Sequence, residues 1–219
     1  PFTAKAQDKV EASVGADFVS NYIWRGTDCG GVSIQPSMGV SYKGLSLAAW
    51  GSVGIDKEDA REIDLTLGYN TGGFNVSVTD YWFSYHKEDG GYTGDYFKYG
   101  AHSTIHIFEA TLGYDFGPLA LSWNTYFAGD DYTKENGDRA YSTYVGISAP
   151  FKLGGLDWSA EVGLTPWEGA YANKFNVTNL TLKAEKEIKF TNSFSLPTFA
   201  QVTFNPHTQG AYFVFGVSF

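Results

Sequence analysis

The last ten residues of the chain, 210–219, place the strongest constraint on what it can fold into. Apolar and other residues alternate from Gly210 to the end of the sequence, and such alternation is typical of a half-buried β-strand. One face carries Ala211, Phe213, Phe215, Val217 and Phe219. That face holds three phenylalanines and no charge. The segment therefore predicts a strand with an apolar face along its full length.

The composition indicates that the rest of the chain is built in the same way. The 219 residues are 43% hydrophobic and 17% aromatic, yet the mean hydropathy is −0.22. The apolar residues are dispersed by alternation, as in strands that face lipid on one side and a polar lumen on the other. No apolar run approaches the roughly 18–20 residues of a membrane helix. We therefore expect an all-β chain.

Charge and cysteine content narrow the function classes. The formal net charge is −9 and the isoelectric point is about 4.8, which disfavours nucleic acid as a partner. Cys29 is the only cysteine, so an internal disulfide is impossible and a cysteine-based metal site is not expected. Asp130, Asp131, Glu135 and Asp138 crowd one segment, but without the spacing of a calcium-binding loop. We expect no metal and no cofactor.

Twelve segments alternate in this manner and predict twelve strands. They are residues 12–25, 32–42, 45–55, 62–70, 74–83, 104–116, 119–127, 140–151, 156–164, 177–190, 196–205 and 210–219. The connections after the second, fourth, sixth, eighth and tenth segments are short, and most of the others are longer and more polar. This alternation favours an up-and-down barrel over a soluble sandwich, which has no reason for it. Ten or fourteen strands are the alternatives to twelve.

The pattern as a whole resembles the β-barrel proteins of bacterial outer membranes. In that family the last strand ends in phenylalanine, and the barrel assembly machinery recognises this strand. The segment 210–219 ends in the same way, at Phe219. The resemblance implies one transmembrane antiparallel up-and-down β-barrel over residues 1–219, with short periplasmic turns and longer outer loops. Residues 1–11 would form a periplasmic lead-in, and both termini would be periplasmic.

The same resemblance implies the partners. They are outer-membrane lipid and the barrel assembly machinery, which would recognise residues 210–219 from Gly210 to Phe219. The oligomeric state stays open. No signal peptide is recognisable, so for an exported protein we expect the mature form.

A narrower resemblance lies in the segment DFVSNYIWRG, residues 17–26. Val19, Ser20, Tyr22, Trp24, Arg25 and Gly26 match the Val-Ser-x-Tyr-x-Trp-Arg-Gly pattern that opens the uncharacterised outer-membrane family of TorF-like (Gcw_chp) proteins. The resemblance supports a small barrel and implies no settled activity. The alternation predicts that the first strand continues to Arg25. The loop 26–31 would then hold Cys29 at the outer surface, facing the medium.

The histidines do not form the patterns of known barrel enzymes. Barrel phospholipases and lipid A deacylases carry His-x-Ser on a strand, and barrel proteases of the omptin kind use paired aspartates and an Asp-His couple. The His-x-Ser spacing is absent at all four histidines, which are His86, His102, His106 and His207, and no Asp-x-His occurs. His102 and Ser103 are adjacent, so on a strand they would point to opposite faces. We expect loop or interface histidines and no enzymatic activity.

Acidic residues dominate the strand faces that are predicted to line a lumen. The residues expected to line a pore are Asp17, Arg25, Glu62, Asp64, Glu109, Asp115, Glu161, Lys183 and Glu185. A pore lined by one charge sign selects the opposite ion. About eight strands leave space only for side chains and about sixteen leave an aqueous channel, so twelve strands permit either outcome.

The function predicted from these patterns is a narrow passive channel for small, cation-leaning solutes. One alternative is a closed structural or adhesion barrel, or an accessory subunit, without transport. A barrel enzyme is the third and least favoured class. Measurable conductance would separate the channel from the other two.

Two details of the strands lead to further predictions. Glycines recur on the inward face near the periplasmic ends, at Gly39, Gly68, Gly113, Gly146 and Gly216. Because glycines supply bends and close approaches, they predict either curvature alone or a shelf without side chains. In the second case part of the segment 1–11 would fold back onto the shelf as a plug. Asp80 interrupts the apolar face of its strand, which predicts a β-bulge near it.

Overall fold

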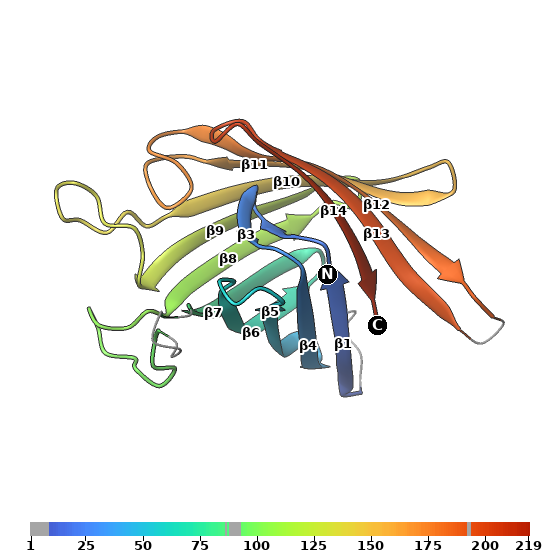
Figure 1. Ribbon diagram of the computed structural model, residues 1–219, viewed down its shortest axis with the longest axis horizontal. Coiled ribbons are helices and arrows are strands. Elements are labelled where there is room, and N and C mark those ends of the chain that lie inside the picture. The colour runs from blue at the N-terminus through green and yellow to red at the C-terminus, as the bar shows by residue number, and fades with distance from the viewer. Residues whose placement is uncertain (1–8, 86, 88–92, 192–193) are drawn as a thin grey trace.

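The computed structural model describes residues 9–85, 87, 93–191 and 194–219. All regular structure in these residues is β-strand. The described part of the chain contains no helix long and apolar enough to cross a membrane. Twelve antiparallel strands close into a barrel, as Figure 1 shows, and two more form a separate hairpin. The prediction of an all-β, antiparallel barrel of about twelve strands is confirmed.

Consecutive barrel strands pair with each other, and the last strand pairs with the first. They are β1 (Glu11–Val19), β4 (Ser33–Tyr42), β5 (Leu45–Gly54), β6 (Arg61–Thr71), β7 (Phe74–Ser84), β8 (Ile107–Asp115), β9 (Ala120–Gly129), β10 (Thr143–Leu153), β11 (Leu156–Thr165), β12 (Asn176–Lys189), β13 (Ser195–Asn205) and β14 (Gly210–Ser218). All of them except β1 begin and end within three residues of the predicted bounds. The alternation therefore located eleven of the twelve strands correctly.

The first strand is the exception, and its predicted extent is wrong. β1 ends at Val19, and the chain then forms a short hairpin of β2 (Tyr22–Trp24) and β3 (Thr27–Gly30). The predicted strand was too long because the alternation of apolar and polar residues continues without a break through β2. The sequence signal for the hairpin was the pair Arg25-Gly26. These two residues have φ values of 51° and 79°, and a two-residue type I′ turn requires positive φ at both positions.

The two ends of the barrel differ in their connections. At one end, which we name the turn end, strands are joined by residues 43–44, 72–73, 116–119, 154–155 and 190–194. At the other, the loop end, the connections are residues 20–32, 55–60, 85–106, 130–142, 166–175 and 206–209. Except for residues 206–209, every connection at the loop end is longer than every connection at the turn end. The predicted alternation of short and long connections is confirmed.

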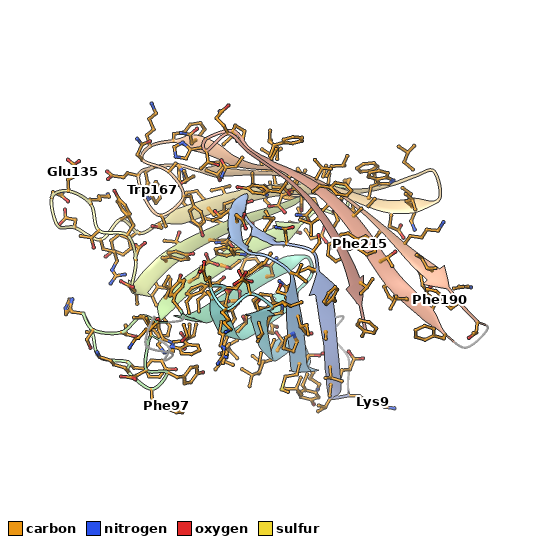
Figure 2. All side chains as sticks on the ribbon, viewed as in Figure 1. Lys9, Phe97, Glu135, Trp167, Phe190 and Phe215 are labelled. Carbon is orange, nitrogen blue, oxygen red and sulfur yellow. The ribbon has the colours of Figure 1, made fainter. Side chains whose placement is uncertain are left out.

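Apolar side chains cover the outside of the barrel, and polar ones fill the inside. The outward side chains that are more than half exposed include Val14, Met38, Leu47, Leu67, Leu112 and Phe213. Phe190, labelled in Figure 2, is a further example at 60% exposure. Among the described residues, the largest side chains with less than 2% exposure are all polar: His106, Glu109, Thr143, Thr165, Thr178, Thr203, Ser33, Ser84 and Ser142. The burial pattern is thus the reverse of that of a soluble domain.

The barrel closes through a short seam between β1 and β14. Only three residue pairs form there, from Asp17 opposite Ser218 to Val19 opposite Gly216. By contrast, β1 pairs with β4 over nine residues. Below the seam, the backbone N–H of Phe219 donates to the carbonyl of Ala16 at 2.9 Å, and the reverse bond is 3.2 Å. The final aromatic residue therefore takes part in closing the barrel.

The inward glycines do not form the predicted shelf. A Cβ added to Gly68 would lie 2.9 Å from the hydroxyl oxygen of Ser46 on β5. A Cβ added to Gly146 would lie 2.8 Å from the hydroxyl oxygen of Ser122 on β9. The space beside these glycines is taken by side chains of the neighbouring strand, so a shelf free of side chains is wrong. Of the segment 1–11, part of which was predicted to plug it, Glu11 begins β1, and residues 1–8 lie outside the described residues.

The β-bulge predicted near Asp80 lies one strand further along. β7 pairs with β6 and with β8 in a constant register past Asp80. The register shifts instead between β8 and β9, at Phe108 and Glu109. Because Phe108 lies opposite Asp80, the irregularity is near the predicted position but does not interrupt β7.

Two glycines in the turn 72–73 provide a test of how closely the backbone packs at the turn end. Gly72 and Gly73 both have positive φ, but only a Cβ at Gly73 would approach backbone, lying 2.6 Å from the carbonyl oxygen of Asp115. We expect Gly73→Ala to lower the free energy of unfolding by more than the about 1–2 kcal/mol that left-handed backbone alone costs. Gly72→Ala, the matched control, should lose only that amount. Thermal unfolding in detergent measures both, and equal losses would contradict the assigned close approach.

Candidate functional site

The β2–β3 hairpin lies inside the barrel and reaches strands on its far side. Figure 1 shows the hairpin, in dark blue, rising where β1 and β4 end. Its base is held by the N–H of Ser20, which donates to the carbonyl of Phe215 on β14 at 2.9 Å. Its tip is held by Asn205 on β13, whose Nδ2 donates to the carbonyl of Gly26 at 3.0 Å. The wall therefore does not continue through the hairpin, and the contact of Arg25 with Glu109 on β8 shows that its tip crosses the lumen.

Arg25, at the tip of the hairpin, forms a two-pronged ion pair with Glu109 on β8. The Nη1–Oε2 distance is 2.5 Å and the Nη2–Oε1 distance is 2.9 Å. The two side chains are 11% and 2% exposed. Tyr81 on β7 also donates its hydroxyl to Oε1 of Glu109, at 2.9 Å. Pairing and hydrogen bonding together compensate a buried carboxylate, which would otherwise be strongly destabilising.

Aromatic rings surround the Arg25 guanidinium group. Its Cζ lies 4.3 Å from the ring centroid of Trp24, 4.7 Å from that of Tyr144 and 5.8 Å from that of Tyr171. The Tyr171 hydroxyl accepts a hydrogen bond from Nη1 of Arg25 at 2.6 Å. A cation over desolvated aromatic faces gains about 2 kcal/mol or more in such settings. We name Tyr81, Glu109, Tyr144 and Tyr171, the four of these residues that do not belong to the hairpin, the Glu109 cage.

The hairpin tip docks onto β12 at a position that only glycine can occupy. A Cβ at Gly26 would clash with the backbone carbonyl of Thr178. That carbonyl is available because the β11–β12 register shifts here: Gly163 lies opposite Asn179, whereas Leu164 lies opposite Val177. Thr178 is the extra residue on β12. The irregularity in the wall and the positive φ of Gly26 thus combine to seat the hairpin.

Two cavities lie on either side of the hairpin. The loop-side cavity, of about 500 Å³, is lined by residues that include Tyr22, Trp24, Cys29, Asp59, Glu62, Tyr126 and Tyr171. The turn-side cavity, of about 340 Å³, is lined by residues that include Arg25, Gly26, Asn124, Glu161, Asn179 and Gln201. Residues of the hairpin line both. The hairpin is therefore the partition between the two spaces.

The predicted pore-lining residues fall into separate groups. Arg25 belongs to the hairpin rather than to the wall, and it pairs with Glu109. Glu62, 5% exposed, lines the loop-side cavity. Asp64 follows it on the same face of β6, and its Oδ1 is buried without a hydrogen-bond partner among the described residues. Glu161 lines the turn-side cavity and accepts a hydrogen bond from the Tyr144 hydroxyl at 2.5 Å.

Three of the remaining four lie toward the turn end, and Asp17 lies in the seam. Lys183 and Glu185 pair with each other at 2.6 Å, with 29% and 56% exposure. Asp115 is exposed and accepts a hydrogen bond from the N–H of Gly117 at 2.7 Å. Asp17 is half-buried in the seam. The structure thus brings Arg25 and Glu109 together and keeps these four away from them.

Cys29 lines the loop-side cavity from β3 and not from the predicted loop 26–31, whereas its access to the medium stays a prediction. Its side chain is half-buried on β3. Burial, followed by the nearby Glu62 carboxylate, raises the pKa of the Cys29 thiol to about 12. The thiol is therefore protonated at neutral pH, and protonated thiols react slowly with electrophiles.

The tyrosines of the site were missed from the sequence. Tyr81, Tyr126 and Tyr144 occupy inward positions on β7, β9 and β10, so strand parity could have placed them in the lumen. Tyr171 lies in the connection 166–175, where no periodic signal exists. Burial raises the pKa of Tyr171 to about 12, with Arg25 opposing and Glu109 adding to the shift. Tyr171 therefore stays neutral and accepts the Arg25 hydrogen bond.

His106 lies in a connection, as predicted for the histidines, but its burial was not foreseen. His106 is fully buried, with Nδ1 2.7 Å from Oδ1 of Asp80 and Nε2 2.7 Å from the carbonyl oxygen of Tyr96. These contacts hold residues 96–106 against β7 and explain how Asp80 is tolerated on an apolar face. His207 does lie in a loop, with Nδ1 3.1 Å from Nδ2 of Asn176. His86 lies outside the described residues.

Comparison with known proteins finds no family model and no curated protein that matches this chain. The structure therefore defines the class by itself: a closed twelve-stranded β-barrel with a polar interior and a hairpin held across its lumen. The resemblance of residues 17–26 to the TorF-like family stays a prediction. The structure does give the matched residues Trp24, Arg25 and Gly26 a common place at the hairpin tip.

Reaction of Cys29 with a maleimide should report whether the hairpin is docked. We expect slow labelling of the folded protein, and labelling at least several-fold faster in Gly26→Ala, because the added methyl group forces the tip away from Thr178. Gly31→Ala is the matched control, since its Cβ would make only an ordinary 3.7 Å contact with Asp59. Fast labelling of the unmodified protein would contradict the docked position.

Proposed function

We propose that this protein is an outer-membrane β-barrel that acts as a narrow passive channel for small, cation-leaning solutes, and that the β2–β3 hairpin closes it. One observation carries the proposal. The hairpin separates two polar cavities, and the Arg25–Glu109 ion pair is the main polar contact of its tip with the wall. A partition held in this manner is a gate if it can leave the lumen.

The membrane location is supported by the outside of the barrel. Soluble proteins rarely expose contiguous apolar patches of more than a few hundred Å², whereas here outward side chains such as Leu47, Leu67 and Phe213 are each more than half exposed. A closed barrel satisfies its backbone hydrogen bonds internally, which a bilayer requires. In outer-membrane barrels the short turns are periplasmic, so the turn end and both termini would lie in the periplasm.

The cation preference is supported by the walls of the two cavities. Glu62 lines the loop-side cavity and Glu161 lines the turn-side cavity. Asp64 adds a third carboxylate on the inward face of β6. A solute that passes the hairpin would meet acidic groups on both sides, and such groups attract cations and repel anions.

A closed structural or adhesion barrel is the second candidate. The close fit of Gly26 against Thr178 favours it, because a tip seated on backbone could act as a permanent seal. In that case the Arg25–Glu109 pair would only stabilise the interior. Conductance separates the two functions, since a permanent seal gives none.

Breaking the ion pair should open the channel. Removing one partner of a buried pair costs about 3–5 kcal/mol, enough to shift the docking equilibrium of the hairpin by about a hundredfold or more. In planar bilayers we expect at least tenfold more open-channel events for Arg25→Ala and for Glu109→Gln. Lys152→Ala is the control, because its pair with Asp157 is 85% and 64% exposed at the turn end.

The same recordings test selectivity. In a salt gradient the reversal potential should indicate a preference for cations, and this preference should weaken at high salt through screening. A preference for anions would contradict the acidic lining. If every variant with a confirmed fold stays silent, the channel proposal fails and the sealed barrel is favoured.

Membrane embedding can be tested by substitutions that differ only in depth. Leu67 and Leu153 are both outward leucines, 54% and 64% exposed, but Leu67 lies inside β6 and Leu153 ends β10 at a turn. In a bilayer, Leu67→Arg should cost about 2–4 kcal/mol and Leu153→Arg about 0–1 kcal/mol. Urea unfolding from lipid vesicles measures the difference. Equal, small costs would indicate a barrel that lies in water.

A further inference from the structure

The Glu109 cage already holds a ligand-like group, the guanidinium of Arg25. We propose that the cage is a binding site for guanidinium-bearing solutes, that Arg25 fills it in the closed state, and that an incoming guanidinium group takes its place when the channel opens. Binding to the cage stands on the geometry alone. The exchange on opening rests on the proposed channel function.

The geometry of the cage selects a planar, forked cation. Glu109 meets two nitrogens of the guanidinium with separate oxygens, at 2.5 and 2.9 Å. The rings of Tyr144 and Tyr171, which do not belong to the hairpin, lie 4.7 and 5.8 Å from the guanidinium carbon. A fork of parallel N–H donors fits a carboxylate in this way, and a delocalised plane stacks on rings. An ammonium group offers neither feature, so it should bind much more weakly.

The loop-side cavity gives a solute a way to the cage. Its volume of about 500 Å³ lies within the range of small-molecule sites. Tyr171 belongs to both the cavity and the cage. The cavity also presents Asp59 and Glu62, and Oδ2 of Asp59 is buried without a hydrogen-bond partner among the described residues. A cationic solute would thus meet acidic groups before it reaches Glu109.

A solute has to compete with Arg25 for the cage, and this competition determines the solute concentration that displacement requires. A tethered group acts at an effective concentration of about millimolar when its tether is short. A simple guanidinium compound should therefore displace Arg25 only at about millimolar concentrations or above. A solute with a second cationic group could do so at lower concentration, because that group could pair with Asp59 or Glu62 in the cavity.

Removing Arg25 empties the cage and makes binding directly measurable. We expect the purified Arg25→Ala protein to bind methylguanidinium saturably, with one site, in isothermal titration calorimetry. Methylammonium, which has the same charge without the fork, should bind at least tenfold more weakly. The double variant Arg25→Ala/Glu109→Gln should lose methylguanidinium binding. Equal binding of both compounds, or binding that survives the loss of Glu109, would overturn the site.

The unmodified protein provides a test that needs no folded variant. Cys29 lies on the hairpin, so displacement of Arg25 should expose its thiol. Methylguanidinium at tens of millimolar, far below denaturing concentrations, should accelerate maleimide labelling of Cys29 several-fold. The same concentration of methylammonium should have no effect. Unchanged labelling with methylguanidinium would count against the exchange of Arg25 for a solute.

Bilayer recordings separate this proposal from the proposed function. If both hold, methylguanidinium on the loop-end side should increase channel opening in the unmodified protein. Binding and faster labelling without conductance in any variant would remove the channel and keep the cage. Conductance that Arg25→Ala increases, with no binding of methylguanidinium to that variant, would keep the channel and remove the cage.

Discussion

A carboxylate inside a barrel is stable only when opposite charge and hydrogen-bond donors compensate its lost hydration. Glu109 is 1% exposed, and its compensation comes from Arg25, a residue 84 positions earlier in the chain, together with Tyr81. The position of the hairpin follows from this requirement. The aromatic rings around the guanidinium and the partition between the two cavities then follow from the position of the hairpin.

The hairpin and the wall are matched at a second point. Gly26 can approach Thr178 because it lacks a side chain, and Thr178 can present its carbonyl because it is the extra residue of an irregular ladder. Gly26 also suits the positive φ of its turn, so it serves both the hairpin and the contact. The bulge, by contrast, weakens the pairing of β11 and β12. It is explained by the contact that Thr178 makes with Gly26.

The sequence predicted the barrel well because its signal is local. Alternation with period two and two-residue turns such as 72–73 are read from neighbouring residues, and eleven of the twelve strands followed from them. The hairpin was missed because alternation continues through β2, while the reason for the break lies in distant contacts. Arg25 and Glu109 were both named as lumen residues, but their pairing required knowledge of which strands face each other across the barrel. Tyr171 lies in a loop, where position depends wholly on tertiary contacts.

The short seam has a consequence for the order in which the chain folds. Neighbouring strands are joined by a few residues and can zip up as local hairpins, whereas β1 and β14 are separated by almost the whole chain, so their pairing is the least local in the molecule. With only three residue pairs, it also yields little stabilisation until the sheet is already curved. The cage draws on β7, β8 and β10, so the nascent sheet has to curl around the hairpin before its ends meet. The partition is thus enclosed during closure and not threaded in afterwards.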